Sequence, residues 1–348
     1  MEIRVYDSEF NLKKVVENFV SLLWHRCYNS VGDFKITAPA TAENIYHLAI
    51  DNIVWVEGKT EAGVIESREI QQDNTKNEIV VSGRFLESYM DRRLIRPRVN
   101  YSGQIEVGMR KILTDAVPIP MVQLGEFNDF PETISFQATY KNLLKYEEKL
   151  AKSGEFGFRF RPDFKNKVIY FEVYKGLDRS ISQNSRARVI FSEEYATLTS
   201  SAYSENSQLY NNVCYVGGQG EGDERTYVVV GDDSLTGLER REVFLNATDV
   251  SQDEMTEQEY LDALRQRGQD LLNENIKTQA VTCVTNPNSN FVYKKHYDVG
   301  DIVTVQKKSW GVNQNERITE VTEIYEHEVP VIEPVFGTLI PETIDWED

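Results

Sequence analysis

Cysteine is scarce in this sequence and follows no ligand spacing. The 348 residues contain three cysteines, Cys27, Cys214 and Cys283, which are odd in number and widely separated. An odd number without C-x-x-C spacing argues against a disulfide framework and against a structural zinc site. We therefore expect buried thiols in a protein made in a reducing cytoplasm.

Long apolar runs are also missing. No stretch approaches the roughly 20 apolar residues of a membrane-spanning helix. The first residues, Met1–Asp7, lack the basic and apolar order of a signal peptide. The sequence predicts no membrane span and no export route encoded in this chain.

The usual catalytic and metal-binding motifs do not occur. Four histidines are scattered along the chain: His25, His47, His296 and His327. No two of them have a metal-binding spacing, and no serine lies in a G-x-S-x-G elbow. His25 stands between Trp24 and Arg26 in an apparent strand, where a structural histidine is more common than a ligand. We predict no catalytic, cofactor-binding or metal-binding residues.

Positive charge is in the minority. The chain has 38 Lys and Arg against 56 Asp and Glu, which gives a formal net charge of −18. No Lys or Arg occurs between Glu320 and Asp348. Tight nucleic-acid binding is disfavoured, because its affinity comes mainly from cations that displace counterions. Such a surface favours solubility and repels DNA.

Adjacent acids leave one enzymatic alternative open. They occur at Glu193–Glu194, Asp232–Asp233 and Asp253–Glu254. A glycosidase needs two carboxylates on either side of a sugar bond, but adjacency in sequence does not establish that separation. An acidic chain also contains such pairs by chance.

Two pairs of arginines are candidate contacts for a partner's carboxylates. Arg240 and Arg241 lie in an acid-flanked segment, and Arg92 and Arg93 belong to an arginine-rich stretch. The guanidinium fork matches a carboxylate in geometry. The alternative is an exposed, charge-balanced surface.

The first hundred residues read as short strands. Short segments with apolar, often β-branched or aromatic, residues are separated by turns: 3–6, 22–28, 34–37, 53–56, 63–68 and 78–83. The type of segment 12–23 is ambiguous. Strands at this spacing predict a small barrel or sandwich over 1–100.

The rest of the chain mixes helices with strands. Apolar residues at three- and four-residue spacing predict a helix over 105–116 and another that carries Tyr140 to Leu150 and closes at a left-handed Gly154. With a hairpin around Pro162-Asp163, they make an α+β unit over 101–188. We expect a second strand-rich unit over 189–348, with a helical insert near 251–276 and an extended acidic tail.

The glycine-rich segment near the middle of this last unit predicts a hairpin. Cys214–Val216 and Thr226–Val230 favour strands, and Gly217–Asp223 between them tolerates a tight turn. A nucleotide loop is disfavoured, because the third glycine of G-x-G-x-x-G falls on Asp223 and acids would repel phosphate.

Several short motifs follow one another along the chain. They are Trp24-His25-Arg26-Cys27-Tyr28-Asn29, Gly32-Asp33-Phe34, Gly63-Val64-Ile65-Glu66, Gly83-Arg84-Phe85-Leu86 with Arg92-Arg93, Tyr215-Val216-Gly217-Gly218, Gly237-Leu238-Glu239-Arg240-Arg241-Glu242, Tyr297-Asp298-Val299-Gly300-Asp301 and Arg317-Ile318-Thr319-Glu320-Val321. Taken in order, they resemble a siphophage tail-hub family of the ReqiPepy type, which is related to the baseplate hubs of Mu-like and T-even phages. The match extends over nearly the whole chain. Each motif is mostly turn and strand chemistry, so the specificity lies in their order.

The resemblance implies a mainly β, α+β chain with two tube-type β-barrels. A homotrimer would then offer six such domains to a hexameric tail tube, line a DNA channel without binding DNA specifically, and contact distal tail and fibre proteins in the virion. We expect no cofactor. Some relatives have a cell-wall-degrading domain after the hub, but Asp348 follows the last matching strand closely, so we expect no enzymatic activity. A tail-tip protein that binds or degrades carbohydrate is the alternative.

Overall fold

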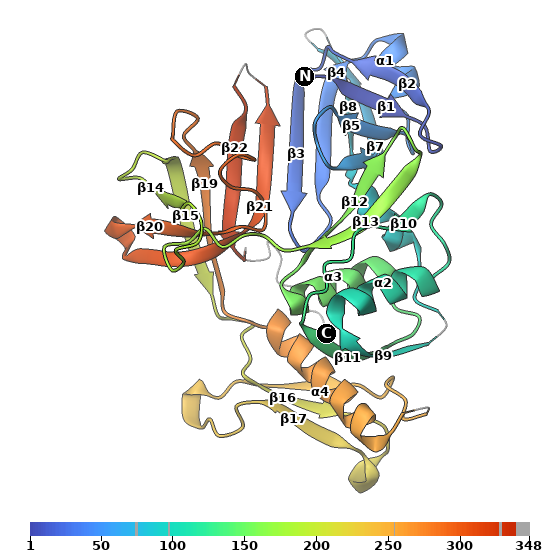
Figure 1. The fold of residues 1–348 in the computed structure, drawn as a ribbon, viewed down its shortest axis with the longest axis vertical. Coiled ribbons are helices and arrows are strands. Elements are labelled where there is room, and N and C mark those ends of the chain that lie inside the picture. Colours follow the sequence, from blue (N-terminus) through green and yellow to red (C-terminus); the bar gives the residue numbers. More distant parts are fainter. Residues whose placement is uncertain (74–75, 97, 254, 327–328, 339–348) are drawn as a thin grey trace.

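The computed structural model describes residues 1–338 except 74–75, 97, 254 and 327–328. Strands dominate this part of the chain, and four α-helices accompany them, so the mainly β, α+β class is confirmed. Buried apolar side chains form four clusters, one for each of the structural units in Figure 1. No helix of the described residues is long and apolar enough to span a membrane.

Two sheets face each other in the N-terminal unit, drawn in blue in Figure 1. One has the order β2-β1-β5-β6, and its strands span Leu12–Val16, Ile3–Tyr6, Ile53–Val56 and Ala62–Val64. The other contains β3 (Ser21–Cys27), β4 (Asp33–Pro39), β8 (Asn77–Arg84) and β7 (Ser67–Gln72). Alternating apolar residues from both sheets fill the core between them. The short helix α1 (Ala42–His47) is capped by Thr41.

The middle unit packs two helices against small sheets. A 3₁₀ helix, η1 (Leu86–Arg92), leads into it, and the sheets contain β9 (Val99–Gln104) with β11 (Thr133–Ala138), and β10 (Val122–Leu124), β13 (Val168–Tyr174) and β12 (Gly157–Asp163). The helices are α2 (Ile105–Asp115) and α3 (Leu143–Gly154), which confirms both predicted helices and the predicted β12–β13 hairpin.

The ends of α3 differ from the prediction. The helix begins after the cap Asn142, so Tyr140 lies outside it and is 72 % exposed. The left-handed cap is Glu155, with φ 54°, and not Gly154. Gly154 is needed for packing, because a Cβ there would lie 2.4 Å from the Phe156 ring.

The C-terminal unit also consists of strands packed around a hydrophobic core. Its strands are β14 (Ile190–Ser192), β15 (Leu198–Asn206), β19 (Thr278–Thr285), β20 (Ile302–Lys307), β21 (Val312–Tyr325) and β22 (Val331–Gly337). A short η4 (Lys308–Trp310) links β20 to β21. β22 lies between β19 and β21, so part of the expected extended tail is a central strand. The tail residues 339–348 lie outside the described residues.

The remaining unit is a three-stranded sheet covered by one helix, at the bottom of Figure 1. The predicted hairpin is present as β16 (Val213–Gly217) and β17 (Tyr227–Gly231), and β18 (Glu242–Asn246) pairs with β16. Short 3₁₀ turns, η2 (Gly222–Glu224) and η3 (Gly237–Glu239), lie between these strands. The predicted capping box of Thr256 and Glu259 begins α4 (Glu257–Glu274).

The N-terminal and C-terminal units share one continuous sheet, because β3 pairs antiparallel with β21. The resulting path of eight strands is β15-β19-β22-β21-β3-β4-β8-β7, which we call the long sheet. Figure 1 shows β21 and β3 side by side at its centre. Among the described residues this sheet is open, with β15 and β7 at its edges, and no strand pairing closes a barrel.

Candidate functional site

The junction of β3, β4 and β21 brings together side chains from distant parts of the sequence. Cross-strand partners share a face of a sheet, so the register sorts these side chains into two sets. Trp24 and Arg26 point into the molecule with their partners on β21, and His25 and Cys27 point to the other side. We call these sides of the long sheet its inner face and its outer face.

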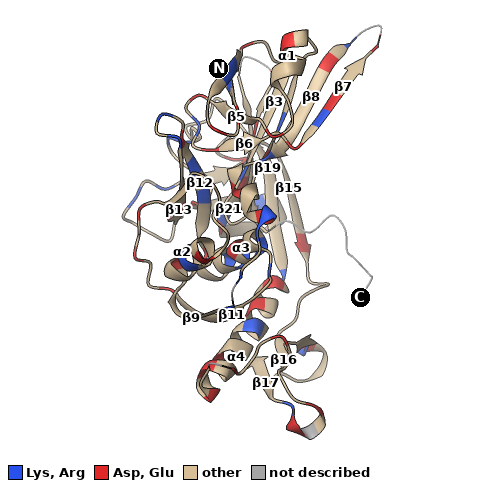
Figure 2. Ribbon diagram, turned by 90° about the vertical axis from the view of Figure 1, so that its right-hand side faces the viewer, with Lys and Arg blue, Asp and Glu red and all other residues tan. Residues whose placement is uncertain are grey.

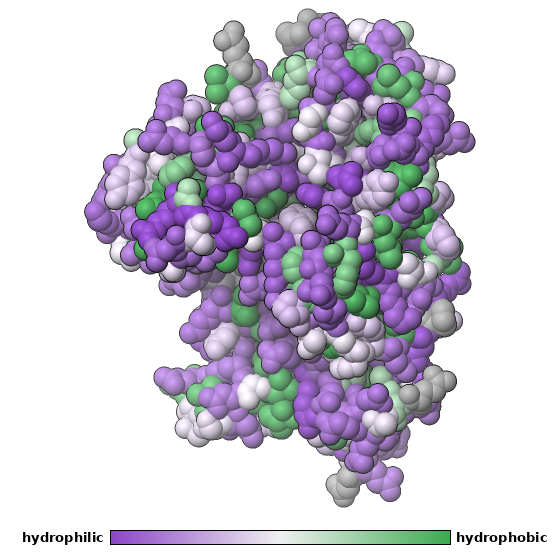
Figure 3. All heavy atoms as spheres, viewed as in Figure 1, coloured by the Kyte–Doolittle hydropathy of each residue, from purple (hydrophilic) through white to green (hydrophobic). Residues whose placement is uncertain are grey.

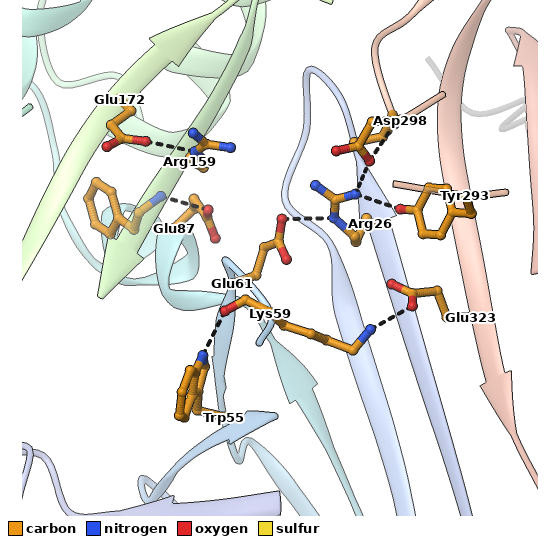
Figure 4. A network of polar contacts seen from close by, with 12 residues as sticks. Arg26, Trp55, Lys59, Glu61, Glu87, Arg159, Glu172, Tyr293, Asp298 and Glu323 are labelled. Carbon is orange, nitrogen blue, oxygen red and sulfur yellow. Dashed lines mark hydrogen bonds and ion pairs between the residues drawn. The ribbon is translucent and has the colours of Figure 1, made fainter. Parts of the chain in front are cut away.

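Arg26 is the centre of a buried polar network on the inner face (Figure 4). Its Nε donates to Glu61 at 2.7 Å, and the two side chains are only 4 % and 7 % exposed. Its Nη1 donates to the Tyr293 hydroxyl and the Asp298 carboxylate. Burial would raise the pKa of Glu61, but the Arg26 guanidinium outweighs it and lowers that pKa to about 2. The network connects Arg26 on β3 to Glu61 of the N-terminal unit and to Tyr293 and Asp298 of the C-terminal unit.

A second buried ion pair lies beside the first. The Lys59 ammonium donates to Glu323 at 2.6 Å, with exposures of 7 % and 4 %, and also to the Tyr325 hydroxyl at 3.1 Å. The Trp55 indole N–H donates a hydrogen bond to the backbone carbonyl of Lys59 at 2.8 Å. Burial lowers the pKa of Lys59, and Glu323 opposes that shift.

Glu87 is a buried acid that no Lys or Arg of the described residues contacts by a hydrogen bond. Its Oε1 accepts the backbone N–H of Phe160 at 2.7 Å, while Oε2 has no hydrogen-bond partner within the part of the chain that the structure describes. Burial raises the pKa of Glu87 to about 7. Nearby Arg159 is held by Glu172 at 2.8 Å, as Figure 4 shows.

His25, Cys27, Asp33 and Glu320 meet on the outer face. His25 Nδ1 lies 2.8 Å from Asp33, and Nε2 lies 3.1 Å from Glu320 and 3.7 Å from the Cys27 sulfur. Burial alone would lower the pKa of His25, but hydrogen bonds to Asp33, Cys27 and Glu320 outweigh it and raise that pKa to about 12. One ligand-type atom each of His25, Cys27 and Glu320 lies within 4.8 Å of the others.

Sequence reasoning missed this grouping because it looked for local ligand spacing. The only local signal is the spacing of His25 and Cys27, which places both on one face of a strand. Glu320 is 295 residues from His25, and only the pairing of β21 with β3 brings it there.

The predicted arginine contacts lie in two separate places. Arg92, on η1, lies 3.5 Å from Asp51 and stacks over the Tyr89 ring. Arg93 donates to the Val117 carbonyl at 3.3 Å.

Arg240 and Arg241 lie in the unit of β16–β18. Arg240 is 19 % exposed and binds Asp233 and the Tyr215 hydroxyl, both at 2.7 Å, and also Glu242. Arg241 donates to the Ser207 carbonyl. The structure therefore does not join the two arginine pairs into one site, and all four arginines have partners within the chain.

The adjacent acids are mostly engaged locally. Glu193 and Glu194 pair with Lys307 and Lys308 respectively. Asp233 pairs with Arg240, whereas Asp232 accepts from Ser234. Asp253 accepts from Ser251, and Glu254 lies outside the described residues. None of the five described acids lines any of the main depressions of the described surface.

Comparison with known proteins identifies the family. A family model described as Siphovirus ReqiPepy6 Gp37-like protein matches residues 2–338. The chain belongs to this family. The resemblance inferred from the ordered motifs is thereby confirmed. No curated protein matches significantly.

Solved structures of tail proteins have the same fold. A tail protein from Neisseria meningitidis MC58 aligns with a TM-score of 0.62 and 13 % identity, covering 97 % of this chain and 96 % of that one. The 43 kDa tail protein of prophage MuSo2 from Shewanella oneidensis gives 0.60 and 10 %, covering 97 % and 98 %. Prophage tail protein gp18 from Listeria monocytogenes EGD-e gives 0.59 and 12 %, covering 97 % and 95 %. The chain therefore shares the fold of phage and prophage tail proteins.

Proposed function

We propose that the chain is a structural hub subunit of a phage tail tip, and that three copies form a ring that joins the hexameric tail tube to the tip and surrounds the DNA channel. The family and the fold describe a single chain, and the proposal concerns how several copies of it assemble. It includes location in the virion after synthesis in the host cytoplasm.

The observation that favours this assembly is the composition of the long sheet. Its path divides at β3–β21 into four strands from the C-terminal unit and four from the N-terminal unit. All neighbours along the path are antiparallel. Three copies would offer six four-stranded sheets, the number that a hexameric tube needs. On this proposal the two barrels expected from sequence form between subunits.

The edges of the long sheet suit such a ring. Among the described residues, β15 pairs only with β19 and β7 only with β8, so each edge strand has a row of backbone groups that no other strand of this part of the chain uses. Every described side chain of β7 is exposed, and Figure 2 shows β7 and β8 projecting from the body. Joining edge β7 to edge β15 of the next copy would satisfy both rows.

The outer face has the character of a channel wall. By register, its carboxylates outnumber its Lys and Arg: Asp33, Glu69, Glu78, Glu320 and Glu333 against Lys35 and Arg84. Ser, Thr and small apolar residues fill most of the remaining positions on its strands. Because nucleic-acid affinity comes from cations, this surface would let DNA pass without binding it.

Edge substitutions test the ring. Ile70 on β7 is 46 % exposed, and Ala202 on β15 is also exposed. A lysine at either edge position opposes strand pairing between copies while leaving the core intact. We expect Ile70→Lys and Ala202→Lys to abolish three-fold rings with a central bore in electron micrographs of the chain mixed with its tail-tube protein.

The matched control is Val107→Lys on α2, because Val107 is 38 % exposed and lies away from both edges. It should leave the rings unchanged. A wild-type chain that stays monomeric with the tube protein, or rings that persist in both edge variants, would overturn the proposed assembly.

We also propose that Arg92, Arg93, Arg240 and Arg241 contact acids of neighbouring subunits. Of Arg92 and Arg240, which both form ion pairs within the chain, Arg92 is more accessible to a neighbouring subunit, since its side chain is 44 % exposed against 19 % for Arg240. Reversing its charge should therefore weaken assembly with less local damage than reversing Arg240.

A non-catalytic role fits the family and the depressions described here. One depression of about 560 Å³ between β11 and α4 has a single carboxylate, Asp262, which pairs with Arg265 at 2.7 Å. Another of about 420 Å³ contains Glu132 and Glu155, paired with Lys175 and Arg317, and Asp178, which accepts the Ser180 backbone N–H at 2.8 Å. The surface in Figure 3 is mainly hydrophilic, with small scattered hydrophobic groups.

We keep the division into 1–100, 101–188 and 189–348 as a proposal about folding units. The unit of α4 and β16–β18, which has a hydrophobic cluster of its own, then belongs to the last of them.

A further inference from the structure

We propose that His25, Cys27 and Glu320 bind a divalent transition-metal ion of the zinc type, and that Asp33 orients the histidine. The ligand atoms are His25 Nε2, the Cys27 sulfur and a Glu320 carboxylate oxygen. This site is independent of the proposed ring, because all of its residues belong to one chain.

The spacing of the ligand atoms matches a tetrahedral zinc site. With Zn–S of about 2.3 Å and Zn–N and Zn–O of about 2.0 Å, tetrahedral angles place S and N about 3.5 Å apart and N and O about 3.3 Å apart. The observed distances are 3.7 Å from the Cys27 sulfur to His25 Nε2 and 3.1 Å from Nε2 to Glu320. Two of the three distances thus match a shared ion, and the sulfur and the carboxylate oxygen lie within 4.8 Å of each other, so side-chain rotation can close the third.

The backbone brings the three ligands to one face through a local irregularity. Glu320 is the cross-strand partner of Cys27. In the pairing of β21 with β22, the register shifts between Ile318 and Glu320, and both Ile318 and Val321 are fully buried. In a regular strand Glu320 would share the buried face of Ile318. The extra residue, Thr319, turns Glu320 to the outer face, in the way that bulges re-aim side chains.

Asp33 supplies the usual support for a metal-binding histidine. It is the cross-strand partner of His25 on β4, and its carboxylate lies 2.8 Å from Nδ1. A carboxylate at this position fixes the ring and its tautomer and leaves Nε2 for the metal. Metal binding displaces the proton of His25 Nε2 and the proton of the Cys27 thiol, and both protons are released to solvent. The bound histidine is then neutral and the cysteine is a thiolate.

The donor set defines the class of ion. Thiolate and imidazole ligands favour zinc and similar ions over Mg²⁺ and Ca²⁺, which prefer oxygen. The side chains of His25 and Glu320 are 26 % and 29 % exposed, so solvent can supply the fourth ligand. The ion would clip β3 to β21 and thereby join the N-terminal and C-terminal units.

The competing explanation for the cluster is a protonated His25 that bridges Asp33 and Glu320 without a metal. Cobalt distinguishes the two. The full chain, stripped with chelator and kept reduced, is titrated with Co²⁺. We expect one ion per chain, with a thiolate-to-cobalt charge-transfer band and the visible bands of a four-coordinate site. Zn²⁺ should displace the cobalt and raise the melting temperature.

Variants locate the site. Cys27→Ser should remove the charge-transfer band, and His25→Gln should prevent stoichiometric binding. Asp33→Asn should weaken the affinity about 10- to 100-fold, as the loss of an orienting partner does. Cys214→Ala and His47→Gln are the matched controls, because both residues lie outside the cluster, and both should bind like the wild type. Circular dichroism of each metal-free variant checks that it folds.

Absence of saturable Co²⁺ and Zn²⁺ binding by the folded wild type would overturn the site in favour of the protonated bridge. A charge-transfer band that survives Cys27→Ser, or binding without any such band, would overturn this ligand set.

Discussion

Charged and polar side chains lie on both faces of the long sheet at β3 and β21, but they are buried on the inner face and partly exposed on the outer face. Arg26, on the inner face, is 3 % exposed and neutralised by Glu61 and Asp298. His25 and Cys27, its direct neighbours in sequence, lie on the outer face, where solvent reaches the cluster. Inner-face charges hold two units together, whereas outer-face groups are available to an ion or to a channel.

The difference follows from solvation. A charge removed from water costs several kcal/mol unless a partner compensates it, so each inner-face charge depends on its partner. On the outer face water screens the charges, and a lost partner is replaced by solvent. Substitutions on the two faces should therefore differ strongly in cost, even between adjacent residues.

The largest effect is expected for Arg26→Met, which leaves the Glu61 carboxylate buried without its partner. Breaking one side of a buried ion pair costs about 3–5 kcal/mol. Urea denaturation should show a loss of that size. The double variant Arg26→Met/Glu61→Leu should recover much of it, because the buried carboxylate is removed together with its partner, and Asp298 is 45 % exposed and solvated by water. A loss below about 1 kcal/mol for the single variant would mean that the inner-face network is not a determinant of stability.

An intermediate effect is expected from Glu87, and it depends on pH. The pKa of Glu87 is about 7 in the fold against 4.5 for the free side chain. A raised folded pKa means that the fold keeps the proton, so stability is full below about pH 4.5 and falls as pH rises to about 7. The difference of 2.5 pKa units corresponds to roughly 3 kcal/mol as an upper bound.

The variant Glu87→Gln removes that titration while keeping an oxygen to accept the Phe160 N–H. Its stability relative to the wild type should rise between pH 4.5 and pH 7, measured by urea denaturation across the range. Other carboxyl groups titrate in both proteins and cancel in the difference. A flat difference would show that Glu87 is ionised in the fold near pH 5.

The smallest effect is expected for Asp33→Asn in chelator-treated protein. Asp33 is 56 % exposed, and exposed ion pairs contribute about 0–1 kcal/mol. The melting temperature should change by no more than a few degrees. A loss of unfolding free energy as large as that of Arg26→Met would show that the two faces do not differ in their contribution to stability.

Sequence patterns predict strands well where the signal is local. β1 has the predicted bounds because alternation follows from the pleat, and β5 has them because a short run of β-branched and aromatic residues favours a strand. β22 was read as a tail, since Pro330, Pro334 and surrounding acids mask its alternation. The cap of α3 was misplaced because a glycine that packs against Phe156 has the same sequence signal as a left-handed glycine.

The candidate site was accessible to sequence reasoning only in part. His25 and Cys27 can be placed on one strand face from their spacing, but the partner strand cannot be identified from a single sequence. Glu320 would also be assigned to the wrong face if β21 were read as regular, because the register shift at Thr319 has no clear sequence signal.

The sequence by itself determined the strand-rich class, most helices and strands, the excess of acid and, through the order of its motifs, the family. These depend on local periodicity, turn chemistry and composition. Only the tertiary structure decided that β3 pairs with β21, which acids meet Arg26 and Lys59, and which groups surround His25. Those contacts join residues up to about 300 positions apart, and they depend on register and burial, which arise when the whole chain packs.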